Sequence, residues 1–285
     1  SSDTKTSNVI NAGRTMPGFY PIYEVNADGS LKTDANGELI PDFGSYRPSG
    51  STSNWNLPAT LPLDKSERMK DEFSGRTFLE VTFIPGLKFK TSFNFDLINY
   101  NSLIGPSVTT GGGSSRVNTR TFSWTWNNIV TYDKTIGEHH FNILAGQEAY
   151  SYRYDELSAS RTKMALPDMP ELVVGSQLTG GSGYRIDYAL VGYLTQALYD
   201  YQNKYFFSAS FRRDGSSRFA PETRWGNFWS LGASWRIDRE NFMISTSDWL
   251  SALTLKASYG AQGNDNLGTY YASKGLYAIV SNLGE

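Results

Sequence analysis

Two groups of residues in this 285-residue chain have side chains that bind metals in other proteins. His139 and His140 are adjacent, and a strand would point their rings to opposite faces, so the two histidines cannot chelate one metal together. The turns at 26–29 and 34–37 gather acidic and amide oxygens. Each turn has its glycine at the fourth position, however, whereas a calcium loop needs glycine at the sixth. A polar hairpin therefore explains the two turns better than a calcium site.

A third group is cationic and lies in the short stretch 212–218. It contains Arg212, Arg213, Asp214 and Arg218, and guanidinium groups are suited to binding an anion. Charges at the end of a strand more often hold a loop in place, so a structural role is the stronger interpretation. We nevertheless keep Asp214 and Arg218 as residues that are expected to contact a substrate or a partner.

A fourth group is aromatic and lies in the first long region of the chain. Phe43, Tyr46 and Trp55 have rings that could stack on sugars, although single exposed aromatic residues are common in loops. Tyr46 and Trp55 are the residues of this group that we expect to contact substrate or partner.

The sequence contains no recognised catalytic or cofactor-binding motif. There is no nucleophile elbow, no phosphate-binding loop and no metal-binding histidine motif, so we expect no catalytic residue, no metal, no cofactor and no enzyme activity. The net charge of -2 argues against nucleic-acid binding, and the absence of cysteine excludes disulfides and thiolate metal sites. No apolar run reaches the roughly 20 residues that a membrane-spanning helix needs.

The elements that must position these residues are long amphipathic strands. Aromatic and aliphatic side chains alternate with small or charged ones along the segments 76–84, 87–97, 121–132, 139–145, 186–199, 204–212, 225–236 and 253–259. Because successive side chains of a strand point to opposite faces, each strand has one apolar and one polar face. The residues expected to face lipid are Phe89, Phe93, Phe95, Trp124, Trp126, Tyr205, Phe207, Phe211, Trp229, Trp235 and Leu255.

The connections between these strands alternate in length. Short turns are expected at 85–86, 133–138, 200–203 and 237–248, and mostly longer breaks at 1–72, 102–116, 155–183, 213–224 and from 261 onward. Up-and-down strands with compact turns at one rim and long loops at the other are typical of a transmembrane β-barrel. A soluble β-sandwich is the alternative, but its strands average about 5–6 residues and would not carry large apolar side chains along one exposed face.

Several segments also resemble a known family. The sequence RRDGSSRF (212–219), followed by RWGNFWSLGASWRI (224–237), resembles the SusC/RagA group of TonB-dependent outer-membrane transporters of Bacteroidota. Further segments fit the same pattern in the same order, namely 124–148, 198–210 and 255–271. Two departures are Gln196, where the family usually has arginine, and 228–230, where it usually has Phe-Pro-Ser.

The resemblance implies an all-β fold that is part of a larger barrel, an antiparallel up-and-down transmembrane β-barrel of which about eight or nine strands are present. Residues 1–75 are expected to form a long extracellular loop region with short hairpins, and residues 76–285 the barrel strands. The family's N-terminal plug and TonB-contacting box have no counterpart in the sequence, and the end at 282–285 lacks the closing aromatic strand of an outer-membrane protein. We therefore expect a middle portion of the barrel.

The same resemblance implies a function in the Gram-negative outer membrane. Transporters of this group import oligosaccharides or peptides, a SusD-like surface lipoprotein closes over the substrate as a lid, and TonB acts through a region that the chain does not contain. Outer-membrane lipid is the remaining expected partner. Two alternatives stay open: a self-contained outer-membrane adhesin or structural barrel, and a soluble β-rich carbohydrate-binding module.

Overall fold

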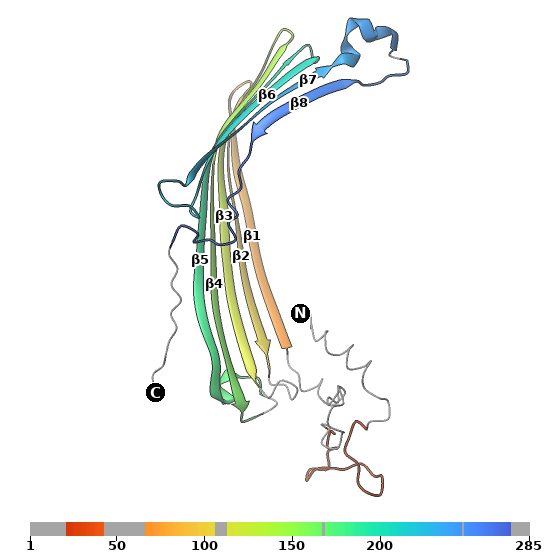
Figure 1. The fold of residues 1–285 in the computed structure, drawn as a ribbon, viewed down its shortest axis with the longest axis vertical. Coiled ribbons are helices and arrows are strands. Elements are labelled where there is room, and N and C mark those ends of the chain that lie inside the picture. Colours follow the sequence, from red (N-terminus) through yellow and green to blue (C-terminus); the bar gives the residue numbers. More distant parts are fainter. Residues whose placement is uncertain (1–20, 43–65, 106–112, 167–168, 247, 275–285) are drawn as a thin grey trace. The chain divides into compact units, whose positions relative to one another are not determined.

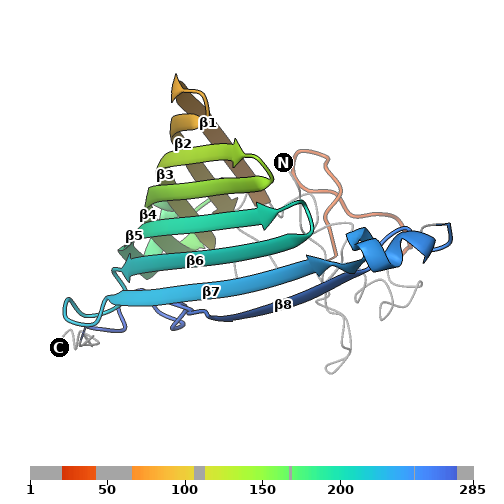
Figure 2. The ribbon, with the colours of Figure 1, turned by 90° about the horizontal axis from the view of Figure 1, so that it is seen from above.

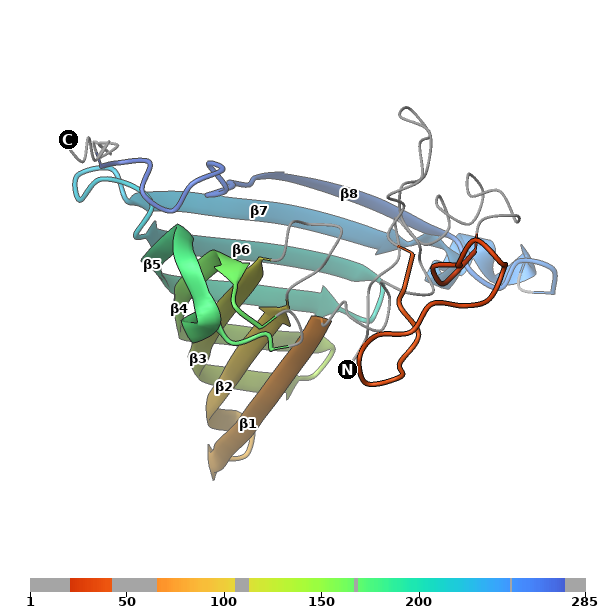
Figure 3. The ribbon, with the colours of Figure 1, turned by 90° about the horizontal axis from the view of Figure 1, so that it is seen from below.

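The computed structural model describes residues 21–42, 66–105, 113–166, 169–246 and 248–274. Its eight β-strands form one antiparallel sheet in which each strand pairs with its neighbours in the sequence, in the order followed in Figures 1 and 2. The strands are β1 (Ser66–Ile84), β2 (Leu87–Ile104), β3 (Ser114–Ile136), β4 (His139–Met164), β5 (Gly175–Tyr201), β6 (Tyr205–Ser216), β7 (Trp225–Arg236) and β8 (Thr254–Ala261). Figure 3 shows β1 and β8 as the two outer strands, so the sheet is open and does not close into a barrel by itself.

The chain divides into two compact units, and the five longest strands run through both. The first unit comprises residues 1–72, 98–120 and 155–185, and the second comprises 73–97, 121–154 and 186–285. The second unit contains β6, β7 and β8 and the three tight turns that join β1 to β2, β3 to β4 and β5 to β6.

Strand register defines the two faces of the sheet. Tyr205, Trp235 and Leu255 stand opposite one another across β6, β7 and β8, and so do their neighbours Phe206, Ser234 and Lys256. Residues that are directly opposite in an antiparallel pair point to the same side. We call the side of Tyr205 and Trp235 the aromatic face and the side of Ser234 and Lys256 the polar face.

The sheet is a single layer without an apolar core. Among the described residues, Ala149 is the one buried hydrophobic side chain, while Leu231 and Leu255 on the aromatic face are 57% and 60% exposed. An apolar surface of such extent marks contact with lipid or with another protein. None of the described helical segments is long and apolar enough to cross a membrane.

The tight turns follow from residues that tolerate a positive φ. Gly86 (φ 89°) joins β1 to β2, and Gly137 (φ 58°) joins β3 to β4. Gln202 and Asn203 (φ 54° and 52°) join β5 to β6, and two successive positive values are typical of a hairpin turn that matches the twist of its strands. Short turns were expected at these three places, and the structure confirms them.

A longer turn joins β7 to β8. It contains two 3-10 helices, η3 (Ile237–Arg239) and η4 (Asn241–Thr246), at the place where the sequence predicted a connection over 237–248.

The structure corrects the extent of several strands. The stretch 155–183, expected to be a long loop, continues β4 to Met164 and starts β5 at Gly175, which leaves a connection of 165–174 with the short helix η2 (Leu172–Val174). β1 begins at Ser66, earlier than the strand expected from Arg76. Polar and small side chains predominate in these extensions, and large apolar ones such as Met69, Phe73, Leu157 and Leu178 are too widely spaced to give an alternation signal, although the backbone still pairs.

The segment 21–42 folds as polar hairpins, as its turn sequences predicted. Bridges join Tyr23 to Pro41, Val25 to Leu31 and Thr33 to Leu39. Gly29 and Gly37 take φ values of 84° and 85°, which only glycine adopts readily, and so allow the two turns. Within the described part of the chain, no three acidic or histidine side chains gather closely enough to hold a metal ion.

Candidate functional site: the polar face and its loop junction

An arginine-centred ion cluster lies on the polar face. Arg212 of β6 donates through Nε to both carboxylate oxygens of Asp214, at 2.7 and 2.8 Å, and through Nη2 to Oε1 of Glu148 on β4, at 2.9 Å. Gly192 of β5 leaves the room for this pair, because an added Cβ there would lie 2.8 Å from Arg212 Nη2 and collide with Asp214. Each charge has a partner, and the cluster links β4 to β6 across β5.

A second cluster, which we call the loop junction, consists of Arg218, Asp265, Tyr188, Tyr270 and Ser216. The guanidinium carbon of Arg218 lies 4.8 Å from the ring centre of Tyr188 and 4.6 Å from that of Tyr270. Arg218 Nη1 donates to the backbone carbonyl of Asp265 at 2.9 Å. Arg218 therefore holds the segment 262–274 against β5.

The carboxylate of Asp265 is the acceptor at the centre of the loop junction. Its Oδ2 accepts hydrogen bonds from the Tyr188 hydroxyl at 2.5 Å and from the Ser216 hydroxyl at 2.9 Å. Burial opposes ionisation of this carboxyl, but those hydrogen bonds and the charge of Arg218 outweigh it, so the pKa of Asp265 is lowered. The segment after β8 is thus attached through an ionised group.

Tyrosine rings extend the loop junction over β4 and β5. The ring of Tyr270 stacks on Tyr152 of β4 at 6.0 Å and meets Tyr188 edge-on at 5.7 Å. The Tyr271 hydroxyl accepts a hydrogen bond from the backbone N–H of Asp187 at 3.1 Å. The sequence reading had assigned no role to these tyrosines.

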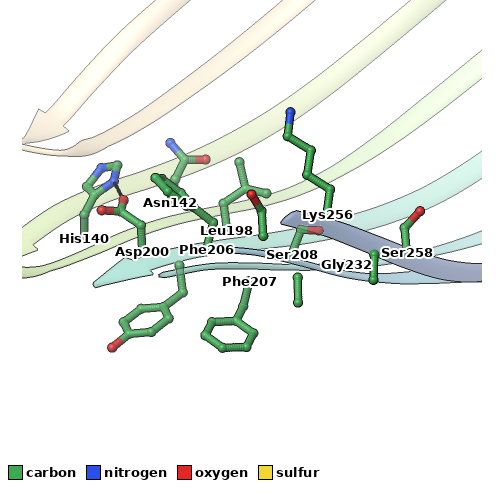
Figure 4. A pocket seen from close by; sticks show the side chains of 14 residues that line it. His140, Asn142, Leu198, Asp200, Phe206, Phe207, Ser208, Gly232, Lys256 and Ser258 are labelled. Carbon is green, nitrogen blue, oxygen red and sulfur yellow. Dashed lines mark hydrogen bonds and ion pairs between the residues drawn. The ribbon is translucent and has the colours of Figure 1, made fainter. Parts of the chain in front are cut away.

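A cavity of about 590 Å³ lies near the short turns and is shown in Figure 4. His140, Asp200 and Lys256 project from the polar face, whereas Phe207 points to the opposite side. His140 Nδ1 lies 2.7 Å from Asp200 Oδ2, and its Nε2 lies 3.2 Å from an oxygen of Asp133.

The neighbouring histidine points the other way. His139 Nδ1 lies 2.8 Å from the Tyr199 hydroxyl, and its ring packs against Tyr201 at 4.8 Å. The prediction that the rings of His139 and His140 point to opposite faces is confirmed.

The aromatic face carries a row of stacked rings beside the short turns. Tyr201 stacks on Tyr205 at 6.4 Å, and Tyr205 stacks on Trp235 at 6.4 Å. Glu240, in the turn after β7, accepts hydrogen bonds from the Tyr205 hydroxyl and from Trp235 Nε1. The hydrogen bond from Tyr205, then that from Trp235, lowers the pKa of Glu240. Rings with one polar end held toward water are suited to a membrane interface.

The aromatic face also carries a polar chain that the sequence reading overlooked. Trp126 Nε1 donates to the Thr91 hydroxyl at 3.0 Å, and that hydroxyl donates to Asn128 Oδ1 at 2.8 Å. Asn128 Nδ2 in turn donates to Gln147 Oε1 at 3.1 Å. These polar groups satisfy one another across β2, β3 and β4, which lowers the cost of placing them among apolar side chains.

The structure brings the residues expected to face lipid onto one face of the second unit. Phe93 lies beside Phe95 and Trp124, with ring centres 6.3 and 6.1 Å away, and Phe211 stands opposite Trp229. Asp214 belongs to the arginine-centred ion cluster and Arg218 to the loop junction. Phe43, Tyr46 and Trp55 lie outside the described residues.

Comparisons with known proteins give a consistent family. No protein-family model matches the chain. TonB-dependent receptor P39 of Formosa agariphila is 29% identical over 94% of this chain and 27% of its own length. TonB-dependent receptor SusC of Bacteroides thetaiotaomicron is 27% identical over 82% of this chain and 24% of its own length.

The solved structure of the RagAB peptide transporter aligns with a TM-score of 0.73 at 25% identity, covering 91% of this chain and 30% of that one. The chain thus spans between about a quarter and 30% of the proteins that it matches. The chain is therefore similar to a portion of SusC/RagA-like TonB-dependent receptors of the outer membrane, a family of transporters rather than enzymes.

Proposed function

We propose that this chain forms part of the wall of an active transporter that imports peptides or oligosaccharides across the outer membrane. The observation that carries the proposal is the alignment with the RagAB peptide transporter over 91% of the chain. Because that neighbour is a peptide transporter, peptides are the first substrate class to test. Oligosaccharides remain the second class, because tyrosine rings such as Tyr188 and Tyr270 of the loop junction are suited to packing on sugars.

In this proposal the two faces of the sheet have separate roles. The polar face, with its arginine-centred ion cluster, lines the path of the substrate, and the aromatic face contacts lipid. Support for the second assignment comes from the exposed apolar side chains of that face and from the ring row beside the short turns.

The partners in this proposal are a SusD-like surface lipoprotein and TonB. The lipoprotein captures substrate on the side of the long loops and closes as a lid, as the two-component RagAB neighbour suggests. TonB, driven by the proton gradient of the inner membrane, supplies the energy through a part of the receptor outside this chain. No bond of the substrate is made or broken in this process.

The test is an uptake experiment in the source bacterium. Deleting the gene should abolish uptake of a fluorescent peptide mixture, or of a fluorescent oligosaccharide mixture, and a plasmid copy should restore it. The receptor should also purify together with a SusD-like lipoprotein. Unchanged uptake of both mixtures together with a lost attachment of cells to surfaces would contradict transport and favour an adhesin.

A further inference from the structure

Arg213 has a position that differs from that of its neighbour Arg212. In the register of β6 it stands opposite Tyr193 of β5 and Asn227 of β7. Its side chain therefore projects from the aromatic face, two residues along the strand from Phe211, whereas Arg212 projects from the polar face. A guanidinium group thus lies on the face that carries the exposed apolar residues.

The surroundings of Arg213 are aromatic. Its guanidinium carbon lies 5.3 Å from the ring centre of Trp225, and the same indole stacks on Tyr193 at 6.1 Å. Gly215 makes this packing possible, because an added Cβ there would come within 3.0 Å of the Trp225 ring. Trp225 and Tyr193 remain 41% and 52% exposed, so the cluster is open on its outer side.

Arg213 forms no ion pair with any residue that the structure describes. Asp214, next to it in the sequence, pairs with Arg212 on the polar face. Asp187 of β5 pairs with Arg153. With no carboxylate paired to it among the described residues, this exposed guanidinium group can pair with an anion from outside the chain.

The position of Arg213 along the strand identifies the kind of anion. The aromatic face of β6 runs from Tyr205 by the short turn, through Phe207 and Phe211, to Arg213 shortly before the strand ends at Ser216. Tryptophan and tyrosine gather where a membrane protein passes from hydrocarbon to headgroups, and arginine beside them extends its charge toward the headgroups. A phosphate is the anion found at that depth, and the planar guanidinium group matches phosphate oxygens in pairs.

We propose that Arg213, with the amide of Asn227 opposite it and the rings of Trp225 and Tyr193, binds the phosphate group of an anionic lipid in the leaflet on the long-loop side. Because Arg213 and Asn227 are directly opposite, their Cβ atoms lie about 5 Å apart, close enough for both side chains to reach one phosphate. The inference rests on the proposed contact of the aromatic face with lipid, and it adds a defined lipid site to it.

The experiment uses the complete receptor in nanodiscs of neutral phosphatidylcholine, with or without added lipid A or phosphatidylglycerol. Thermal unfolding and native mass spectrometry measure stabilisation and retained lipid for the wild type and for Arg213→Gln. Arg76→Gln is the matched control, because Arg76 lies on the polar face of β1 and also forms no ion pair with a described residue. A parallel series replaces the anionic lipid with inorganic phosphate in neutral nanodiscs.

We expect anionic lipid to stabilise the wild type and Arg76→Gln alike, and Arg213→Gln to lose at least about 3-fold in retained lipid, the loss of one charged contact. Equal retention by the wild type and Arg213→Gln would overturn the lipid site, and so would equal losses in the two variants. If inorganic phosphate alone stabilises the receptor, and this stabilisation depends on Arg213, the site binds free phosphate and the proposal of a lipid ligand is wrong.

Brominated lipid separates failure of this site from failure of the proposed lipid contact. Brominated lipid quenches the fluorescence of tryptophans that contact it. If less fluorescence is quenched in Trp225→Phe than in the wild type, Trp225 contacts lipid, whatever Arg213 binds. If that quenching is seen while Arg213→Gln retains lipid normally, the phosphate site alone is wrong. If Trp225 is not quenched, the lipid contact of this end of the aromatic face is wrong as well.

Discussion

Replacing Arg218 by methionine should release the segment 262–274 from β5 without unfolding the sheet. Methionine keeps much of the apolar stem and removes the guanidinium group, which packs between Tyr188 and Tyr270 and donates to the carbonyl of Asp265. Because the segment follows the last described strand, its release leaves the pairing of β1 to β8 intact.

The size of the effect follows from these contacts. Each cation–π contact contributes roughly 0.5–1 kcal/mol, and a hydrogen bond from a charged donor contributes roughly 1.5–3 kcal/mol. The Arg218 side chain is 12% exposed, so solvent screens these contacts little. Its Nε is buried without an acceptor among the described residues, which subtracts from the gain. We therefore expect the docking free energy to fall by about 2–3 kcal/mol.

Hydrogen exchange measured by mass spectrometry on the complete receptor tests this estimate. A loss of about 2–3 kcal/mol should speed amide exchange across 262–274 by roughly 30–150-fold, with little change in β2 and β3. Arg76→Met, which removes an arginine far along the sequence from that segment, is the control. Unchanged exchange in Arg218→Met, or the same acceleration in both variants, would refute the role of Arg218.

Three further predictions concern other positions. Phe93→Arg should cost about 2–4 kcal/mol of unfolding free energy in lipid vesicles while Ser92→Arg on the polar face is tolerated, and equal costs in a urea titration would contradict the assignment of the faces. The pKa of Asp265 is lowered in the folded protein. The stabilisation that this carboxylate gives to the docked segment should therefore persist as the pH falls to 3.8, the ordinary pKa of the group, and be lost at lower pH. The amides of the segment, measured by hydrogen exchange corrected for the intrinsic rate at each pH, should lose protection below pH 3.8 in the wild type and not in Asp265→Asn, and a loss already between about pH 7 and 5 would argue against this carboxylate. Gly192→Val should force apart the arginine–aspartate pair of β6 and cost about 1–3 kcal/mol by thermal unfolding, whereas Gly181→Val, with open space around it, should cost less.

The architecture was largely predictable from the sequence because alternation reports a contrast between the two sides of a strand. Along 204–212, aromatic and small polar residues alternate strictly, and the register of β6 with β7 agrees with that pattern. In 155–164 the large apolar side chains are Leu157 and Met164, and polar or small ones fill the other positions of both faces, so alternation stops while the strand continues. Glycines 180, 181 and 183 were read as a break but lie inside β5.

The loop junction was less predictable because its partners are far apart in the sequence. Arg218 was identified by its charge, but Asp265 and Tyr188 were not, since nothing in a single sequence pairs positions 47 or more residues apart. The one signal was indirect: both Arg218 and Asp265 fall in segments that resemble the family. The polar chain through Asn128 and Gln147 was overlooked for a different reason, namely that single polar residues within an aromatic stripe look like exceptions until the structure shows them bonded to one another.

The three arginines of 212–218 show how one residue of register decides what a charge does. Arg212 faces Glu148 and Asp214 and is neutralised within the sheet. Arg213 points to the other face, where a ring is its one partner and no anion is supplied by the residues that the structure describes. Arg218, beyond the strand, stacks between two tyrosines and holds a distant segment. A single anion site built from all three is therefore excluded by geometry, because alternation sends adjacent side chains to opposite sides. A ligand that reaches Arg212 from the polar face therefore cannot contact Arg213 as well.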